Sequence, residues 1–132
     1  MGKQVISYPQ NIRELCGIDT IIFTYSVDVA NKLRAALGRD FQIIYHSLKI
    51  DSYDVLEWVQ EALYHSHIFI VSNSATPFMS GYALSYATEQ NPELVIGIGL
   101  DGETATFLNA ITKNSVKIYD QINDAVQYIK EQ

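Results

Sequence analysis

Short apolar runs alternate along the chain with segments in which apolar positions recur at helical spacing. Runs rich in β-branched and aromatic residues predict five strands, at residues 20–25, 41–45, 67–71, 93–98 and 115–119. Amphipathic segments between and after them predict helices near residues 28–37, 52–63, 79–89, 105–111 and 120–129. This alternation of strand and helix is typical of an α/β protein.

Buried strands joined by helices favour a parallel sheet whose two faces are both covered. We therefore expect a three-layer, doubly wound, flavodoxin-like α/β domain with a five-stranded sheet, and right-handed crossovers favour the strand order 2-1-3-4-5. Ligands usually bind at the carboxyl edge of such a sheet. That edge is formed here by the loops after Tyr25, Tyr45, Val71 and Ile98.

The length of 132 residues suits a single domain over residues 1–132, because no repeat or linker-like tract divides the chain. Residues 1–18 precede the first predicted strand and form an N-terminal extension. A short helix is expected at residues 9–16 of this extension, since Pro9 suits a helix start and Gly17 a stop.

The starts of three helices are marked by side chains that accept backbone hydrogen bonds. Asp28 is the expected N-cap of the first helix, Asp51 or Ser52 that of the second, and Asp120 that of the last. Oxygen atoms at these positions satisfy N–H groups that the first helical turn leaves unpaired.

The charge of the chain argues against nucleic acid as a partner. Nine Lys and Arg residues against fifteen Asp and Glu give a net charge of −6, and the basic residues are dispersed. No apolar run approaches the ~20 residues of a membrane span, so we expect no membrane insertion. Cys16 is the single cysteine, which excludes an intrachain disulfide and suits a cytoplasmic setting.

Residues 97–102 form a literal GxGxxG, which in dinucleotide-binding proteins cradles a pyrophosphate. Too few residues follow Asp120 to complete a mononucleotide-binding half, and Asp101 and Glu103 stand where the anion would lie. We interpret the motif as a glycine-bearing strand exit.

No metal site is expected. His46, His65 and His67 show no helical pairing and have no cysteine partners. A phospho-acceptor receiver domain would need an acidic cluster after the first strand and an aspartate after the third. Those positions hold Tyr-Ser-Val at 25–27 and Ser-Asn-Ser at 72–74, and Asp28 is the only carboxylate nearby, which excludes that class.

The segment at residues 66–87, SHIFIVSNSATPFMSGYALSYA, carries the most functional information. A strand enters a small-polar loop, and an aromatic residue stands where the loop meets the next helix. The first turn of that helix contains no carboxylate.

Four blocks in order along the chain resemble the TIR (Toll/interleukin-1 receptor) domain. Residues 21–26, followed by Asp28, are similar to its first strand, F-I-S-Y-S with an acidic residue close behind. Residues 47–52 are similar to the family's BB loop after the second strand, although the usual Pro-Gly is absent.

The last two blocks adjoin each other. Residues 62–71 match A-L-x-x-S-x-x-F-I-V, and residues 74–82 follow the two Ser places of L-S-x-x-F-x-x-S-x-W, with Tyr82 in the Trp place. Together the blocks extend over most of the chain, and the resemblance implies a flavodoxin-like TIR fold.

Enzymatic TIR domains cleave NAD at the nicotinamide–ribose bond with one glutamate in the third helix. A carboxylate suits that reaction because it stabilises an oxocarbenium-like transition state. The resemblance places Tyr86 at this position, and a phenol is neutral at physiological pH. Glu89 on the same helical face, or Tyr86 as a nucleophile, are the catalytic alternatives.

The nucleoside deoxyribosyltransferases are more distantly similar. Their E-x-G-x-A motif can be laid on residues 79–83, where the glutamate is again missing. Two families that cleave N-glycosidic bonds therefore point to the same part of the chain.

The resemblance implies a signalling or defence module that assembles with other TIR-like domains or with itself, binds a nucleotide without cleaving it, or does both. The interaction loop would contain Lys49, Ile50, Asp51 and Ser52. No cofactor is required, and NAD or an ADP-ribose-type nucleotide is the expected ligand. The candidate ligand-binding residues are Tyr25, Ser26, Asp28, Tyr53, Ser74 and Tyr82. The alternative is an NAD glycohydrolase or cyclase that uses Glu89.

Overall fold

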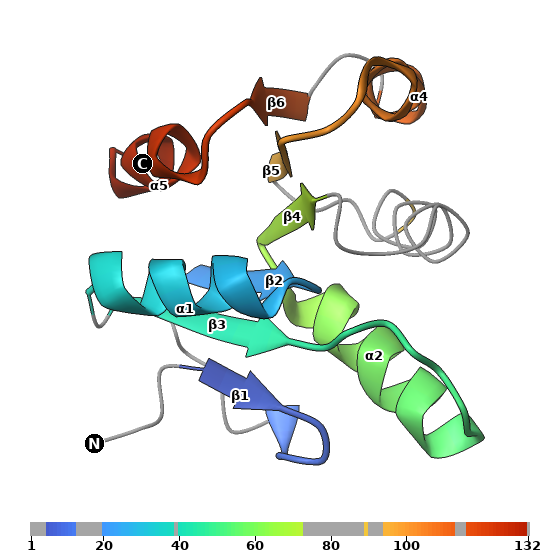
Figure 1. The fold of residues 1–132 in the computed structure, drawn as a ribbon. Helices are drawn as coiled ribbons and strands as arrows, with labels where there is room; N and C mark the ends of the chain where they lie inside the picture. The colour runs from blue at the N-terminus through green and yellow to red at the C-terminus, as the bar shows by residue number, and fades with distance from the viewer. Residues whose placement is uncertain are drawn as a thin grey trace.

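The computed structural model describes residues 5–12, 20–38, 40–72, 89, 94–112 and 116–131. In these residues a parallel sheet of six strands is accompanied by four helices (Figure 1), which confirms the α/β class. The strands are β1 (Val5–Ser7), β2 (Thr20–Thr24), β3 (Phe41–Tyr45), β4 (Ile68–Ser72), β5 (Leu94–Ile98) and β6 (Val116–Tyr119). The helices are α1 (Val27–Ala36), α2 (Tyr53–His65), α4 (Gly102–Ile111) and α5 (Ile122–Lys130).

The sheet order is β1-β3-β2-β4-β5-β6, so the predicted five-stranded order 2-1-3-4-5 is wrong for the sheet as a whole. The difference is β1, which pairs in parallel with β3 through Val5 and Ile43 and forms one edge. From β2 onward the neighbours are β3-β2-β4-β5-β6. β1 has only three residues, and a strand so short takes its conformation from its partner rather than from its own sequence.

Pro9 does not begin a helix. It lies in the turn that follows β1, where the Gln10 N–H donates to the Ser7 carbonyl at 2.9 Å. The remainder of the predicted helix at 9–16, beyond residue 12, is outside the described residues.

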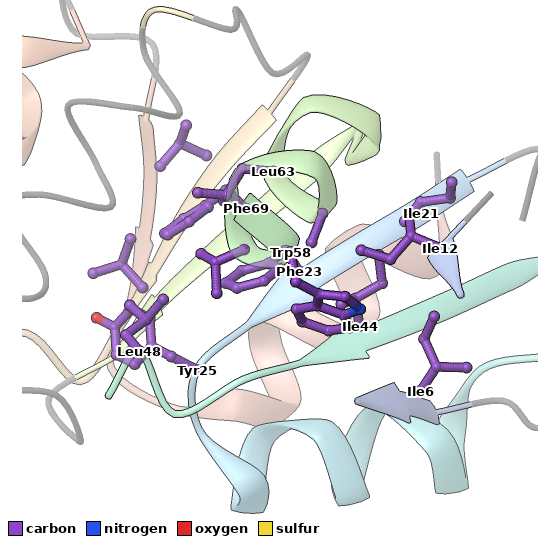
Figure 2. Close-up of a cluster of buried hydrophobic side chains, with 14 of the residues drawn as sticks. Ile6, Ile12, Ile21, Phe23, Tyr25, Ile44, Leu48, Trp58, Leu63 and Phe69 are labelled. Atoms are coloured by element: carbon purple, nitrogen blue, oxygen red, sulfur yellow. The ribbon is translucent and has the colours of Figure 1, made fainter. Parts of the chain in front are cut away.

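The helices cover both faces of the sheet. On one face α2 packs against β2 and α4 against β6, and the rings of Phe23 and Phe69 stack in this core with centroids 5.5 Å apart (Figure 2). On the other face α1 and α5 pack beside each other over Ile22, Ile70 and Ile96. The alternation of side chains along each strand therefore feeds two separate cores, as a doubly wound sheet requires.

Two predicted helix caps differ from the observed ones. Ser26 caps α1 by accepting from the Val29 N–H at 3.3 Å, and Asp28 lies in the first turn instead. Helix α5 begins after Gln121, without a side-chain cap, so Asp120 is not its N-cap. Ser52, one of the two predicted possibilities, does cap α2.

Among the residues described, we find no helix with the length and apolar character needed to cross a membrane.

Candidate functional site

The carboxyl ends of the strands meet at one edge of the sheet because all strand pairs are parallel. From β2 the chain crosses to β3 on one side, and from β4 it leads to β5 on the other. The order thus reverses between β2 and β4, and in open α/β sheets ligands bind outside the strand ends at such a switch point. Tyr25 and Ser26 follow β2 at this point, and Ser72 ends β4.

Tyr25 connects the two strands that form the switch point. Its hydroxyl donates to the Ser72 carbonyl at 2.6 Å and accepts from the Ser72 N–H at 2.9 Å. The side chain is buried, and Figure 2 draws it with Leu48 in the same core cluster. The phenol predicted to bind a ligand thus makes its hydrogen bonds to the backbone of the neighbouring strand.

Ser26 and Asp28 differ in their access to solvent. Ser26 is buried, and its N–H donates to the Thr24 hydroxyl at 3.2 Å while its own hydroxyl caps α1. Asp28 is exposed on the first turn of α1. Of the predicted ligand-binding groups at this strand end, Asp28 is exposed to solvent, whereas Ser26 is buried and caps helix α1.

The loop after β3 begins with an unusual backbone turn. The His46 N–H continues the sheet by donating to the Thr24 carbonyl at 3.2 Å. The His46 Nδ1 then accepts from the Leu48 N–H at 2.8 Å, and Leu48 has a φ of 64°. The Leu48 side chain is buried, at 1% exposure, and packs in the core, which holds the loop against the sheet.

The electrostatic environment of His46 favours the neutral ring. Burial lowers the pKa of His46 from its ordinary value, while the Asp51 carboxylate acts in the opposite direction and raises the pKa. A ring nitrogen accepts a hydrogen bond only when it carries no proton, which agrees with the contact to Leu48.

The outer part of this loop presents mixed charges and an aromatic ring to solvent. Lys49, Asp51 and Ser52 are exposed, whereas Ile50 is half-buried and packs against the core. Tyr53 opens α2 and is 74% exposed. The structure therefore brings the predicted interaction loop and Tyr53 into one continuous segment.

Trp58 fastens this segment to the N-terminal residues. Its indole N–H donates to the Gln10 carbonyl at 2.7 Å, and its ring meets Tyr8 edge-on with centroids 5.8 Å apart. The His46 ring packs beside Trp58 in a tilted arrangement, with a centroid distance of 5.8 Å. The contacts to Gln10 and Tyr8 join positions far apart in the sequence, so the local sequence pattern does not predict them.

The third-helix candidates are mostly outside the described residues. Tyr86, Ser74 and Tyr82 fall in the undescribed ranges, so their predicted roles stay predictions. Glu89 is described, and it is helical and exposed.

The glycine motif has a structural role in the described residues. Gly97 lies in β5, where an added Cβ would stand 2.6 Å from the Leu100 Cδ1, and Gly99 turns the chain with a φ of +61°. Asp101 caps α4 by accepting from the Thr104 N–H at 2.7 Å. The glycines and the aspartate thus form a strand exit and a helix start.

The other histidines serve the fold. His67 Nδ1 accepts from the Ile21 N–H at 3.0 Å, which extends the pairing of β2 and β4, and His65 meets Tyr64 edge-on. Within the described part of the chain, no three His, Cys, Asp or Glu side chains gather in a way that could hold a metal ion.

Comparison with known proteins adds no family to this geometry: no family model, curated protein or solved structure matches the chain.

Proposed function

We propose that the chain is a TIR-like module that works by docking to other TIR-like domains, including copies of itself, through residues 49–53. The resemblance of residues 47–52 to the BB loop supports the choice of this surface. A cytoplasmic setting without nucleic acid is part of the proposal.

The exposure of Tyr53 is the observation that carries the proposal. A tyrosine that is 74% exposed leaves most of an aromatic ring in water, and tyrosine is among the residues that dominate binding energy at protein interfaces. The buried Leu48 and the Ser52 cap hold the backbone on either side of the exposed residues. A partner would therefore meet an ordered loop, which limits the entropy lost on binding.

The charges of the loop suit contact between copies. Lys49, Asp51 and Asp54 are exposed and follow each other closely along the chain, so that one short segment offers both charge signs. In a two-fold interface the same patch faces itself, and a patch with both signs can pair with its own copy.

Light scattering of the purified chain against concentration tests this proposal. We expect reversible association that Tyr53→Ala weakens at least tenfold, the loss typical of an interface hot spot. Tyr64→Ala is the matched control, because Tyr64 is 64% exposed on the same helix but near its other end. A strict monomer, or equal weakening by both substitutions, would contradict the proposal.

A second candidate function is non-catalytic binding of NAD or an ADP-ribose-type nucleotide. The observation that favours it is the reversal of strand order between β2 and β4, where α/β sheets bind ligands. Titration calorimetry with ADP-ribose tests binding, and release of free nicotinamide from NAD tests cleavage. We expect no turnover; sustained turnover that Glu89→Gln abolishes would establish the NAD-cleaving alternative instead.

A further inference from the structure

The shape of the loop after β3 depends on one residue in the left-handed region. Leu48 has a φ of 64°, a conformation that residues other than glycine rarely adopt. Two contacts hold it there: its side chain is 1% exposed, and its N–H donates to the His46 Nδ1 at 2.8 Å. The loop therefore keeps this turn only while both contacts persist.

His46 is itself fixed between two elements. Its main chain continues the pairing of β3 with β2 through the Thr24 carbonyl, and its ring packs beside Trp58 of α2 at an interplanar angle of 43°. The hydrogen bond to Leu48 therefore joins an imidazole that packs beside Trp58 to a left-handed turn.

We propose that His46 is a proton-operated latch: its neutral ring holds residues 47–52 in the docking conformation, and protonation releases them. The inference rests on the proposed docking function, because it assigns the regulation of the same loop.

The chemistry of the release follows from the imidazole. Nδ1 offers a lone pair to the Leu48 N–H only in the neutral ring. Once Nδ1 carries a proton, two N–H groups point at each other, and the left-handed turn loses one of its two supports. The burial of the Leu48 side chain alone then opposes the unfavourable backbone conformation.

The groups around the ring set the direction of the pH response. Thr24 from β2 and Trp58 from α2 are uncharged, and Asp51 from the loop is the charged group that acts on His46. Burial outweighs Asp51 and lowers the pKa of His46. The latch is therefore closed above the ordinary histidine pKa and opens as the pH falls through the lower value in the folded protein.

Fluorescence of Trp58 reports the latch directly, since it is the single tryptophan of the chain and an imidazolium beside an indole quenches its emission. In a pH titration of the full chain we expect quenching with a midpoint below 6.5, the ordinary histidine value. The Leu48 amide resonance in an ¹⁵N-¹H spectrum should shift with the same midpoint. A midpoint at or above the ordinary value, or a Leu48 amide that does not titrate, would overturn the proposal.

His46→Asn is the decisive variant. The Asn carbonyl oxygen can accept the N–H of the residue two positions later and does not titrate in this range. The variant should keep the loop closed and lose the fluorescence transition, whereas His65→Asn on α2 should retain it.

Association separates this inference from the docking function. For the wild type the dissociation constant should rise by up to tenfold for each pH unit below the fluorescence midpoint, the limit for release coupled to one proton. For His46→Asn it should stay within about twofold of its starting value. An identical pH dependence in both proteins would refute the latch. Absence of any association would refute the docking function, and with it the regulatory part, while the fluorescence titration would still decide whether His46 holds the turn.

Discussion

At the scale of single residues, the most consequential contact is the one between Tyr25 and Ser72. The buried Tyr25 hydroxyl donates to the carbonyl and accepts from the N–H of Ser72, which lies 47 positions further along the chain. Hydrogen bonds contribute more when water is excluded, because the loss of one partner leaves a desolvated group behind. Tyr25 thus positions the ends of β2 and β4, between which the second candidate function would place a nucleotide.

The first prediction concerns this hydroxyl. Tyr25→Phe keeps the ring in the core and removes both hydrogen bonds, so the free energy of unfolding should fall by about 1–3 kcal/mol. Urea denaturation measures the change. The matched control is Tyr53→Phe, whose hydroxyl belongs to an exposed side chain and whose loss should change stability by less than about 0.5 kcal/mol. Equal stabilities of the two variants would show that the contact to Ser72 contributes nothing.

At the scale of elements, the two sheet edges argue against assembly by strand pairing. β1 offers only three residues, and β6 carries the exposed Lys117, whose ammonium lies 5.9 Å from the centre of the Tyr128 ring. Short edge strands and edge lysines are devices that prevent edge-to-edge association. The docking surface is therefore better sought on the loop at residues 49–53 than along the sheet.

The second prediction follows from the β6 edge. Lys117→Val removes the charge and adds a β-branched residue, so on gentle heating the variant should aggregate several-fold faster than the wild type. Turbidity and thioflavin fluorescence measure the rate. Lys130→Val is the control, because Lys130 is also exposed but ends helix α5. Faster aggregation of both variants to the same extent would point to the added apolar side chain instead of an unprotected edge.

The third prediction concerns the start of α4. The hydrogen bond from the Thr104 backbone N–H lowers the pKa of Asp101. The helix dipole also stabilises a carboxylate at the N-terminus of a helix. Because the folded-state pKa lies below the unfolded value, this stabilisation is complete above the unfolded pKa and is lost as the pH falls through the folded one.

Asp101→Asn isolates this effect, since asparagine caps helices but does not titrate here. The melting temperature of the wild type should exceed that of the variant near neutral pH, and the difference should vanish in acid. Calorimetric scans across this range measure it. A difference that persists unchanged at the lowest pH would show that the charge of Asp101 plays no part.

At the scale of the whole molecule, the sequence predicted what local pattern controls and missed what distant contacts control. The β-branched runs gave the strands from β2 onward, because a buried parallel strand needs a continuous apolar sequence. β1 was missed because its three residues become a strand only by pairing with Ile43 and its neighbours. Ser26 rather than Asp28 caps α1. The sequence did not predict this, because both residue types are good caps and the choice depends on where the chain leaves β2 and begins the helix.

The candidate site was less predictable than the fold. Residues 49–52 could be proposed as an interaction loop because they are contiguous, and that role stays a prediction. The turn at Leu48 could not be predicted, because its residue type disfavours the left-handed conformation. The contacts of Trp58 with Gln10 and of Tyr25 with Ser72 join segments distant in sequence. Neither contact leaves a signal in the local pattern.

The last prediction uses the net charge of −6 to test whether repulsion between copies limits self-association at low salt. Two copies of this chain repel each other at long range, and salt screens that repulsion: the Debye length falls from about 30 Å at 0.01 M to about 10 Å at 0.1 M salt. Self-association through a loop that contains both charge signs should therefore strengthen severalfold as salt rises over this range. Sedimentation velocity at matched protein concentrations measures it. Weakening by salt would contradict this prediction, because it would mean that attraction between opposite charges of the two loops outweighs the repulsion between the net charges of the two copies.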